Sequence, residues 1–129
     1  MPYRIEILVE EKLVHVVFEG MLDDEVSQKS VDELRARLGS RRDFDLIVDF
    51  TRADFAPLRS RTVLKRTGEQ PIFENTSRHA FVAPGDLSFG FANMYKAMRD
   101  DAAGEIRVFR NLHEAYEWLG REAPVSRDI

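Results

Sequence analysis

The sequence predicts a single α/β domain in which helices cover a mixed, five-stranded sheet. Apolar and polar residues alternate over the first twenty positions, which is typical of strands. Further along, amphipathic helical patterns alternate with short apolar runs, which favours parallel strands joined by helical crossovers. A chain of 129 residues is also long enough for one domain with its own core.

The runs "YRIEILVEE" and "KLVHVVFEG" have a period of two and are separated by charged residues near 10–12, which predicts a hairpin. Their second faces are more polar, so we expect both strands at the margin of the sheet. The outer edge there can be free, covered, or paired in a homodimer.

The first helix is predicted over residues 23–39. Val31, Leu34 and Leu38 follow helical spacing, acidic residues fill the first turn, and Gly39 is placed to end the helix. The run "FDLIVDF" that follows is almost wholly apolar, which indicates a central strand covered on both faces.

A second helix is expected to begin with Pro57 in its first turn and to end near Gly68 or Pro71. "RHAFVA" predicts the fourth strand, and Asp86 is placed to cap the third helix.

"EIRVF" predicts the fifth strand. Asn111 with Glu114 is a cap pair for the last helix, which Gly120 ends. The expected order is β-β-α-β-α-β-α-β-α, with the domain at residues 1–122 and a flexible tail at residues 123–129.

Composition narrows the function classes. There is no cysteine, which excludes disulfides and thiolate metal sites, and the net charge of −4 gives no global signal for nucleic acid. No apolar run is long enough for a transmembrane segment, and the N-terminus lacks the apolar core of a signal peptide. We therefore expect a cytoplasmic protein.

Motifs for catalysis are absent from the sequence. It contains no G-x-G-x-x-G, G-K-[ST] or G-x-S-x-G string. His15, His79 and His113 are scattered, and each is expected to be partly exposed. The acidic cluster at 23–25 falls where a helix N-terminus favours acids. We expect no metal, no cofactor and no enzymatic activity; a hydrolase-like enzyme whose histidines converge in the fold is the weakest alternative.

Two segments could form binding sites. Residues 55–68 carry four basic residues and no acid. The third predicted helix carries a stripe of aromatic and methionine side chains, which can either pack in the core or line an apolar pocket. The stripe consists of Phe89, Phe91, Met94, Tyr95 and Met98.

The chain resembles the STAS domain, the fold of anti-sigma-factor antagonists, and within it the SpoIIAA-like branch that is grouped with CRAL-TRIO-type lipid-binding domains. The resemblance covers roughly residues 3 to 120. It rests on the strings "FEGMLDDEV", "LIVDFTRAD", "RHAFVAPGDLSFGFANM" and "EIRVFRNLHEAYEWLG".

In antagonists of the phosphoswitch type, an Asp-Ser pair follows the third strand and opens a helix, and a kinase phosphorylates that serine. On this chain the pair falls on Pro57 and Leu58. Ser60 is nearby, but we expect it inside the helix and it has no acidic neighbour. The resemblance therefore implies the fold without the phosphoacceptor.

The leading expectation is a non-enzymatic binding or regulatory module that contacts a protein partner or an anionic ligand after the third strand. The alternative is a carrier or sensor of a small hydrophobic ligand or lipid, bound between the sheet and the third helix. The surface expected for the leading function comprises Thr51, Asp54, Phe55, Leu58, Arg59 and Arg61.

Overall fold

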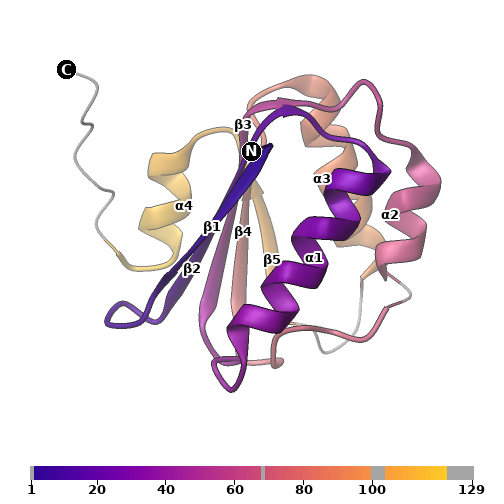
Figure 1. Cartoon of the computed structure of the whole chain (residues 1–129). Helices are drawn as coiled ribbons and strands as arrows, with labels where there is room; N and C mark the ends of the chain where they lie inside the picture. The colour runs from indigo at the N-terminus through magenta and orange to yellow at the C-terminus, as the bar shows by residue number, and fades with distance from the viewer. Residues whose placement is uncertain (1, 68, 100–103, 122–129) are drawn as a thin grey trace.

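In the computed structural model, which describes residues 2–67, 69–99 and 104–121, one five-stranded sheet separates two layers of helices (Figure 1). The predicted tail at 123–129 lies outside these residues. The elements are β1 (Tyr3–Leu8), β2 (Leu13–Met21), α1 (Asp24–Leu38), β3 (Asp45–Asp54), α2 (Ser60–Thr67), β4 (Arg78–Val82), α3 (Asp86–Met98), β5 (Glu105–Phe109) and α4 (Leu112–Trp118).

The strand order is β1-β2-β3-β4-β5, and only β1 is antiparallel to its neighbour. The predicted mixed sheet is confirmed, and β1 lies at its edge. The expectation that β2 is also marginal is wrong. β2 lies between β1 and β3, and even its second face is covered, because Leu13 and Val17 are buried.

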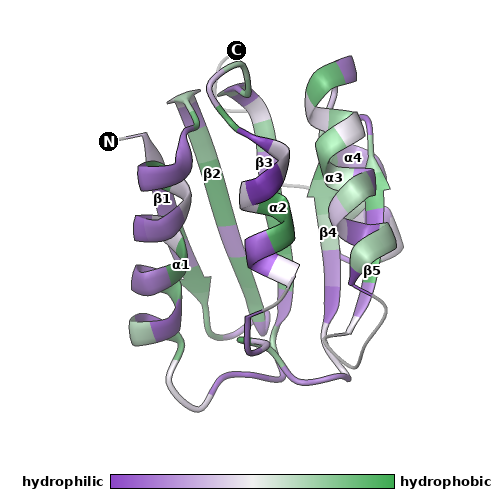
Figure 2. Cartoon of the chain, turned by 90° about the vertical axis from the view of Figure 1, so that its right-hand side faces the viewer, coloured by the Kyte–Doolittle hydropathy of each residue, from purple (hydrophilic) through white to green (hydrophobic). Residues whose placement is uncertain are grey.

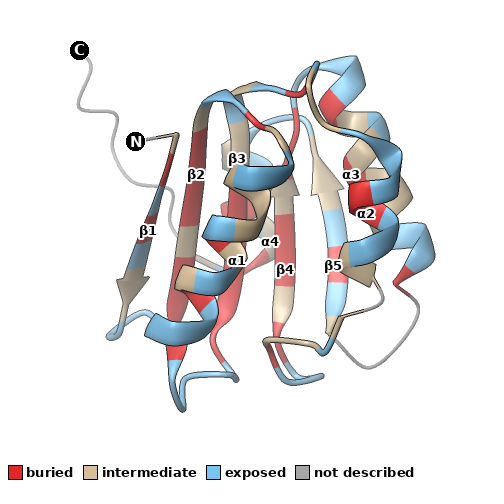
Figure 3. Cartoon of the chain, turned by 45° about the vertical axis from the view of Figure 1, so that its right-hand side comes forward, coloured by how far each residue is buried: buried red, intermediate tan, exposed pale blue. Residues whose placement is uncertain are grey.

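Helices α1, α2 and α3 lie side by side on one face of the sheet, and α4 covers the other face (Figures 1 and 2). Alternate residues of each strand therefore enter two separate cores. The larger core, under α1–α3, includes Val16, Val48 and Phe18, and the smaller core, under α4, includes Ile47 and Tyr116. Figure 3 shows buried residues along the inner strands, as expected for strands covered on both faces.

The helix ends follow local chemistry. Asp23 caps α1 by accepting a hydrogen bond of 2.8 Å from the backbone N–H of Val26. The predicted cap of α4 is confirmed, since Asn111 accepts from the backbone N–H of Glu114. The predicted cap of α3 is wrong: Gly85 occupies the cap position and Asp86 is the first helical residue.

Candidate functional site

The predicted surface after β3 is only partly a surface. Thr51, Arg59 and Arg61 are exposed, and the exposed Asp54 accepts a hydrogen bond from the backbone N–H of Ala56. The described residues contain no side-chain ion pair to Arg59 or Arg61. These two arginines therefore remain available at the start of α2.

Phe55 and Leu58 point inward instead. Phe55 is 5% exposed, and both side chains line the interior space beneath α2. The expectation that Phe55 offers a surface contact is wrong, because its ring packs edge-on against Phe50 and stacks with Phe91. Burial among aromatic rings removes it from solvent.

Helix α2 begins later than the sequence suggested. Its first residue is Ser60, so Pro57 lies in the preceding turn and Ser60 is at the helix N-terminus, not inside the helix. Ser60 still differs from the Asp-Ser motif, because the motif falls on Pro57 and Leu58 and because Arg59, not an acid, precedes Ser60.

The main candidate site is a cavity of about 200 Å³ between the sheet and helices α1, α2 and α3. Its floor comes from β2, β3 and β4 through residues such as Val16, Val48 and Phe81, and the segment 69–73 closes one end. The lining is mainly apolar. The space is partly open to solvent, and concave, mostly apolar pockets are the usual form of small-molecule sites.

The predicted stripe on α3 only partly faces this cavity. Phe91 and Tyr95 line it, together with Ala92 between them. Phe89 instead lies under the guanidinium of Arg110, 3.8 Å from ring centroid to Cζ. Met94 and Met98 do not line the cavity; Met98 is 39% exposed.

A connected series of aromatic rings forms the cavity wall. Phe18 stacks on Phe50 with centroids 5.5 Å apart, and Phe50 meets Phe55 and Phe81 edge-on. Phe81 in turn stacks on Tyr95 at 5.5 Å. These rings come from β2, β3, β4, α3 and the β3–α2 connection, so no local sequence pattern could have predicted their convergence.

Three arginines contact one segment of the cavity lining, residues 69–70. Arg66 forms an ion pair with Glu69, and Arg35 donates a hydrogen bond of 3.4 Å to the carbonyl of Gln70. Arg99, which is 8% exposed, donates to the carbonyl of Glu69 at 3.3 Å. Three arginines from three different helices or their ends thus converge on the segment 69–70, whose only charged side chain is Glu69.

His79 is buried, which corrects the expectation of a partly exposed histidine. Its Nε2 atom lies 3.0 Å from the hydroxyl oxygen of Ser77, and that hydroxyl donates its proton to the carbonyl of Phe44. Ser77 must therefore accept from His79, so the pair is not arranged as a nucleophile with its base. Burial lowers the pKa of His79 to about 4, which keeps it neutral near neutral pH.

The other histidines are not paired with it. His15 lies on the α4 side of the sheet, edge-on to Tyr116, and burial lowers its pKa. Its Nε2 atom is buried without a hydrogen-bond partner in the described part of the chain. His113 is exposed on α4 and lies 3.5 Å from Glu117.

The acidic cluster at 23–25 has structural partners. Asp23 caps α1, Asp24 accepts a hydrogen bond from the Thr62 hydroxyl of α2, and Glu25 pairs with Lys29 at 3.1 Å. Within the described ranges, no group of three or more His, Asp or Glu side chains is placed to hold a metal ion. No helix of those ranges is long and apolar enough to cross a membrane.

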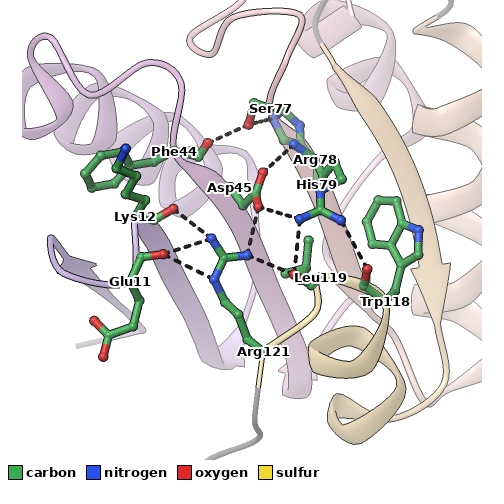
Figure 4. A network of polar contacts seen from close by, with 10 residues as sticks. All are labelled: Glu11, Lys12, Phe44, Asp45, Ser77, Arg78, His79, Trp118, Leu119 and Arg121. Carbon is green, nitrogen blue, oxygen red and sulfur yellow. Dashed lines mark hydrogen bonds and ion pairs between the residues drawn. The ribbon is translucent and has the colours of Figure 1, made fainter.

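A polar network surrounds Asp45, the first residue of β3 (Figure 4). The Asp45 carboxylate oxygen Oδ2 forms ion pairs with Arg78 Nη2 at 3.1 Å and with Arg121 Nη1 at 2.8 Å. Burial by itself would raise the pKa of Asp45, but these hydrogen bonds and charges outweigh it and lower the pKa. Both arginines also donate to the carbonyl of Leu119, so the network fixes the end of α4 and has a structural role.

Comparisons with known proteins support the fold. No family model and no curated protein matches the sequence. One similar solved structure is that of an uncharacterised protein of the DUF3478 family from Shewanella loihica PV-4, described as having a SpoIIAA-like fold. It is 20% identical in sequence, has a TM-score of 0.62, and the match covers 91% of each chain. The chain described here therefore has a SpoIIAA-like fold.

Proposed function

We propose that this protein is a non-enzymatic binding module that holds a small, largely apolar ligand in the cavity under α1–α3. The observation that carries the proposal is the cavity itself, about 200 Å³ in volume and walled by aromatic and aliphatic side chains. Ligand sites are typically concave and mostly apolar, with a few polar groups that fix orientation. This cavity has that composition.

The volume limits the ligand. An engineered apolar cavity of about 150 Å³ is known to bind benzene. A space of about 200 Å³ suits one or two rings or a short alkyl chain, and is too small for both chains of a membrane lipid. A carrier or sensor of a compact molecule fits this size.

The hydrogen bonds of the interior polar groups support a non-enzymatic role. His79 lines the cavity and donates its Nε2–H to the hydroxyl oxygen of Ser77. That hydroxyl in turn donates its proton to the carbonyl of Phe44. Neither group is prepared to attack a bound molecule. Two further lining hydroxyls are also engaged as donors, since Ser30 donates to the carbonyl of Ser27 and Thr62 donates to Asp24.

The test fills the cavity from α3. Ala92→Leu places a larger side chain in the lining, and Ala97→Leu, on the exposed face of the same helix, is the matched control. Native mass spectrometry and saturation-transfer NMR with 1-octanol and 2-naphthol would measure binding. We expect binding to the wild type and to Ala97→Leu and loss of binding in Ala92→Leu. Equal binding by all three proteins would contradict the proposed location.

We also propose a second contact, with an acidic partner, at the start of α2. The observation that favours it is the pair of exposed arginines, Arg59 and Arg61, with exposed Lys65 on the same helix. Arginine forms paired hydrogen bonds with carboxylates and phosphates. Phe55 and Leu58 line the cavity and immediately precede this part of the chain, so ligand occupancy would be sensed at the start of α2.

A pull-down with a double variant, Arg59→Glu with Arg61→Glu, tests this contact. The control is Arg41→Glu with Lys96→Glu, which reverses two exposed charges elsewhere. Partners should be lost from the first variant and kept by the second. Recovery of the same partners with both would show that this surface is not the contact.

A further inference from the structure

The ligand site has a polar end as well as an apolar body. Three guanidinium groups, of Arg35, Arg66 and Arg99, contact the segment 69–70 at one end of the cavity, and all three residues line it. Among the described residues of the lining, Glu69 carries the only acidic side chain. Among these side chains, Arg35 and Arg66 carry two positive charges against the one negative charge of Glu69, while most of the remaining described lining is apolar.

The two arginines at the seam between α1 and α2 have different surroundings. The Arg66 side chain is 14% exposed, and its Nε and Nη2 atoms donate to Ser27 and Gln28, which are uncharged. Arg35 is exposed, and its hydrogen bond to Gln70 is long, at 3.4 Å. Arg35 can therefore move toward an anion at little cost, whereas Arg66 is already held in position.

The type of anion is indicated by Glu69. Among the described residues, the anion that pairs with Arg66 is a carboxylate, that of Glu69. Arg66 has one Nη1–H left beyond its contacts with Glu69, Ser27 and Gln28. A second carboxylate would therefore be held mainly by the planar guanidinium of Arg35, with Arg66 as a further donor.

We propose that the cavity selects a compact monocarboxylate, a molecule with one carboxylate and an apolar body of one or two rings or a short alkyl chain. The body lies among the rings of Phe50, Phe81 and Phe91, and the carboxylate lies between Arg35 and Arg66. This inference rests on the proposed function, since it names the ligand class of the same cavity.

Calorimetric titration of the full chain with octanoate, 2-naphthoate and uncharged 1-octanol tests the proposal. Hydrogen bonds to charged groups are the stronger ones, so octanoate should bind about tenfold more tightly than 1-octanol, or better. The relative affinities of octanoate and 2-naphthoate show whether the body is a chain or a ring system.

The variants are Arg35→Gln and Arg66→Gln, with Arg41→Gln as the control. Arg41 is exposed and follows α1, outside the cavity lining. We expect the first two variants to lose most of the preference for octanoate while 1-octanol binds as before, which also shows that the cavity is intact. Arg41→Gln should retain the preference. Arg35→Gln provides the test even if Arg66→Gln disturbs folding, because Arg35 is exposed.

The two proposals fail in different ways. Equal affinity for octanoate and 1-octanol in the wild type would overturn the carboxylate inference and leave the apolar site supported. Tighter binding of octyl phosphate than of octanoate would also overturn it, by identifying a phosphate site. Failure of every one of these probes to bind would overturn the apolar site as well.

Discussion

Arg121 donates a hydrogen bond of 2.8 Å to Asp45, and thereby joins the end of the described chain to the start of β3. Arg121 also donates to the carbonyl of Glu11 in the β1–β2 turn, and Arg78 reaches Asp45 from β4. A single carboxylate thus organises three distant segments of chain (Figure 4).

Asp45→Ala should lower the free energy of unfolding by about 2–3 kcal/mol. Removing one partner of a buried pair costs about 3–5 kcal/mol, and the cost is lower here because Arg78 and Arg121 are partly exposed and can be hydrated. Urea denaturation of the variant measures this loss. Asp43→Ala, at an exposed neighbouring position, is the control; equal losses in both variants would show that the network contributes nothing specific.

Stability should fall as the pH falls from about 6.5 toward 4. His79 has a pKa of about 4 in the folded protein and an ordinary value of 6.5, so the unfolded chain binds the proton first. The stability contribution of neutral His79 is complete above about pH 6.5. It is lost as the pH falls from 6.5 to about 4, by about 3 kcal/mol in all. The lowered pKa of His15 acts in the same direction.

Urea denaturation at several pH values would measure this slope. His79→Gln should make stability less dependent on pH in that window, although His15 would leave some dependence. His113→Gln, which changes an exposed histidine, should keep the wild-type profile. An unchanged slope in His79→Gln would refute the assignment.

Gly104→Ala should destabilise the protein by about 2 kcal/mol or more. Gly104 has a φ of +113°, and a Cβ atom there would lie 2.2 Å from the carbonyl oxygen of Ser77. Gly90→Ala is the comparison, because Gly90 lies inside α3 in open space. It should stabilise the protein by about 0.5–1 kcal/mol. Thermal unfolding that ranks the two variants in the opposite order would contradict the described backbone.

Filling the cavity should stabilise the ligand-free protein. Ala92→Leu adds apolar atoms to a space that is otherwise unfilled, and cavity-filling changes commonly add about 0.5–2 kcal/mol. Ala97→Leu, at an exposed position, should change thermal stability little. A marked loss of stability in Ala92→Leu alone would show that the space is too small for the added side chain, and therefore for a ligand.

The fold could be predicted because its signals are local. The spacing of Leu34 and Leu38 and the cap at Asn111 depend on residues within a turn or two, and both are confirmed. The predicted start of α2 at Pro57 is wrong, because proline suits the first turn of a helix and a preceding turn equally well. The sequence predicts Asp86 as the cap because aspartate is a common capping residue. Gly85 takes that position without any side-chain hydrogen bond, which the sequence pattern does not reveal.

The site could be predicted only in part. The stripe on α3 identified Phe91 and Tyr95, but a stripe cannot show that neighbouring layers leave space between them. The convergence of Arg35, Arg66 and Arg99 depends on contacts between α1, α2 and the end of α3. His79 also contacts Phe73, which precedes β4, and their ring centroids lie 4.9 Å apart.

The most direct test of the central claim is to locate a bound ligand by intermolecular nuclear Overhauser effects. Naphthoate or octanoate bound to the labelled protein should give effects to protons of Val48, Phe81 and Phe91, which line the cavity. It should give none to Ile47 or Leu119, which lie in the core on the α4 side of the sheet. Effects confined to the α4 side or to exposed residues would contradict the account.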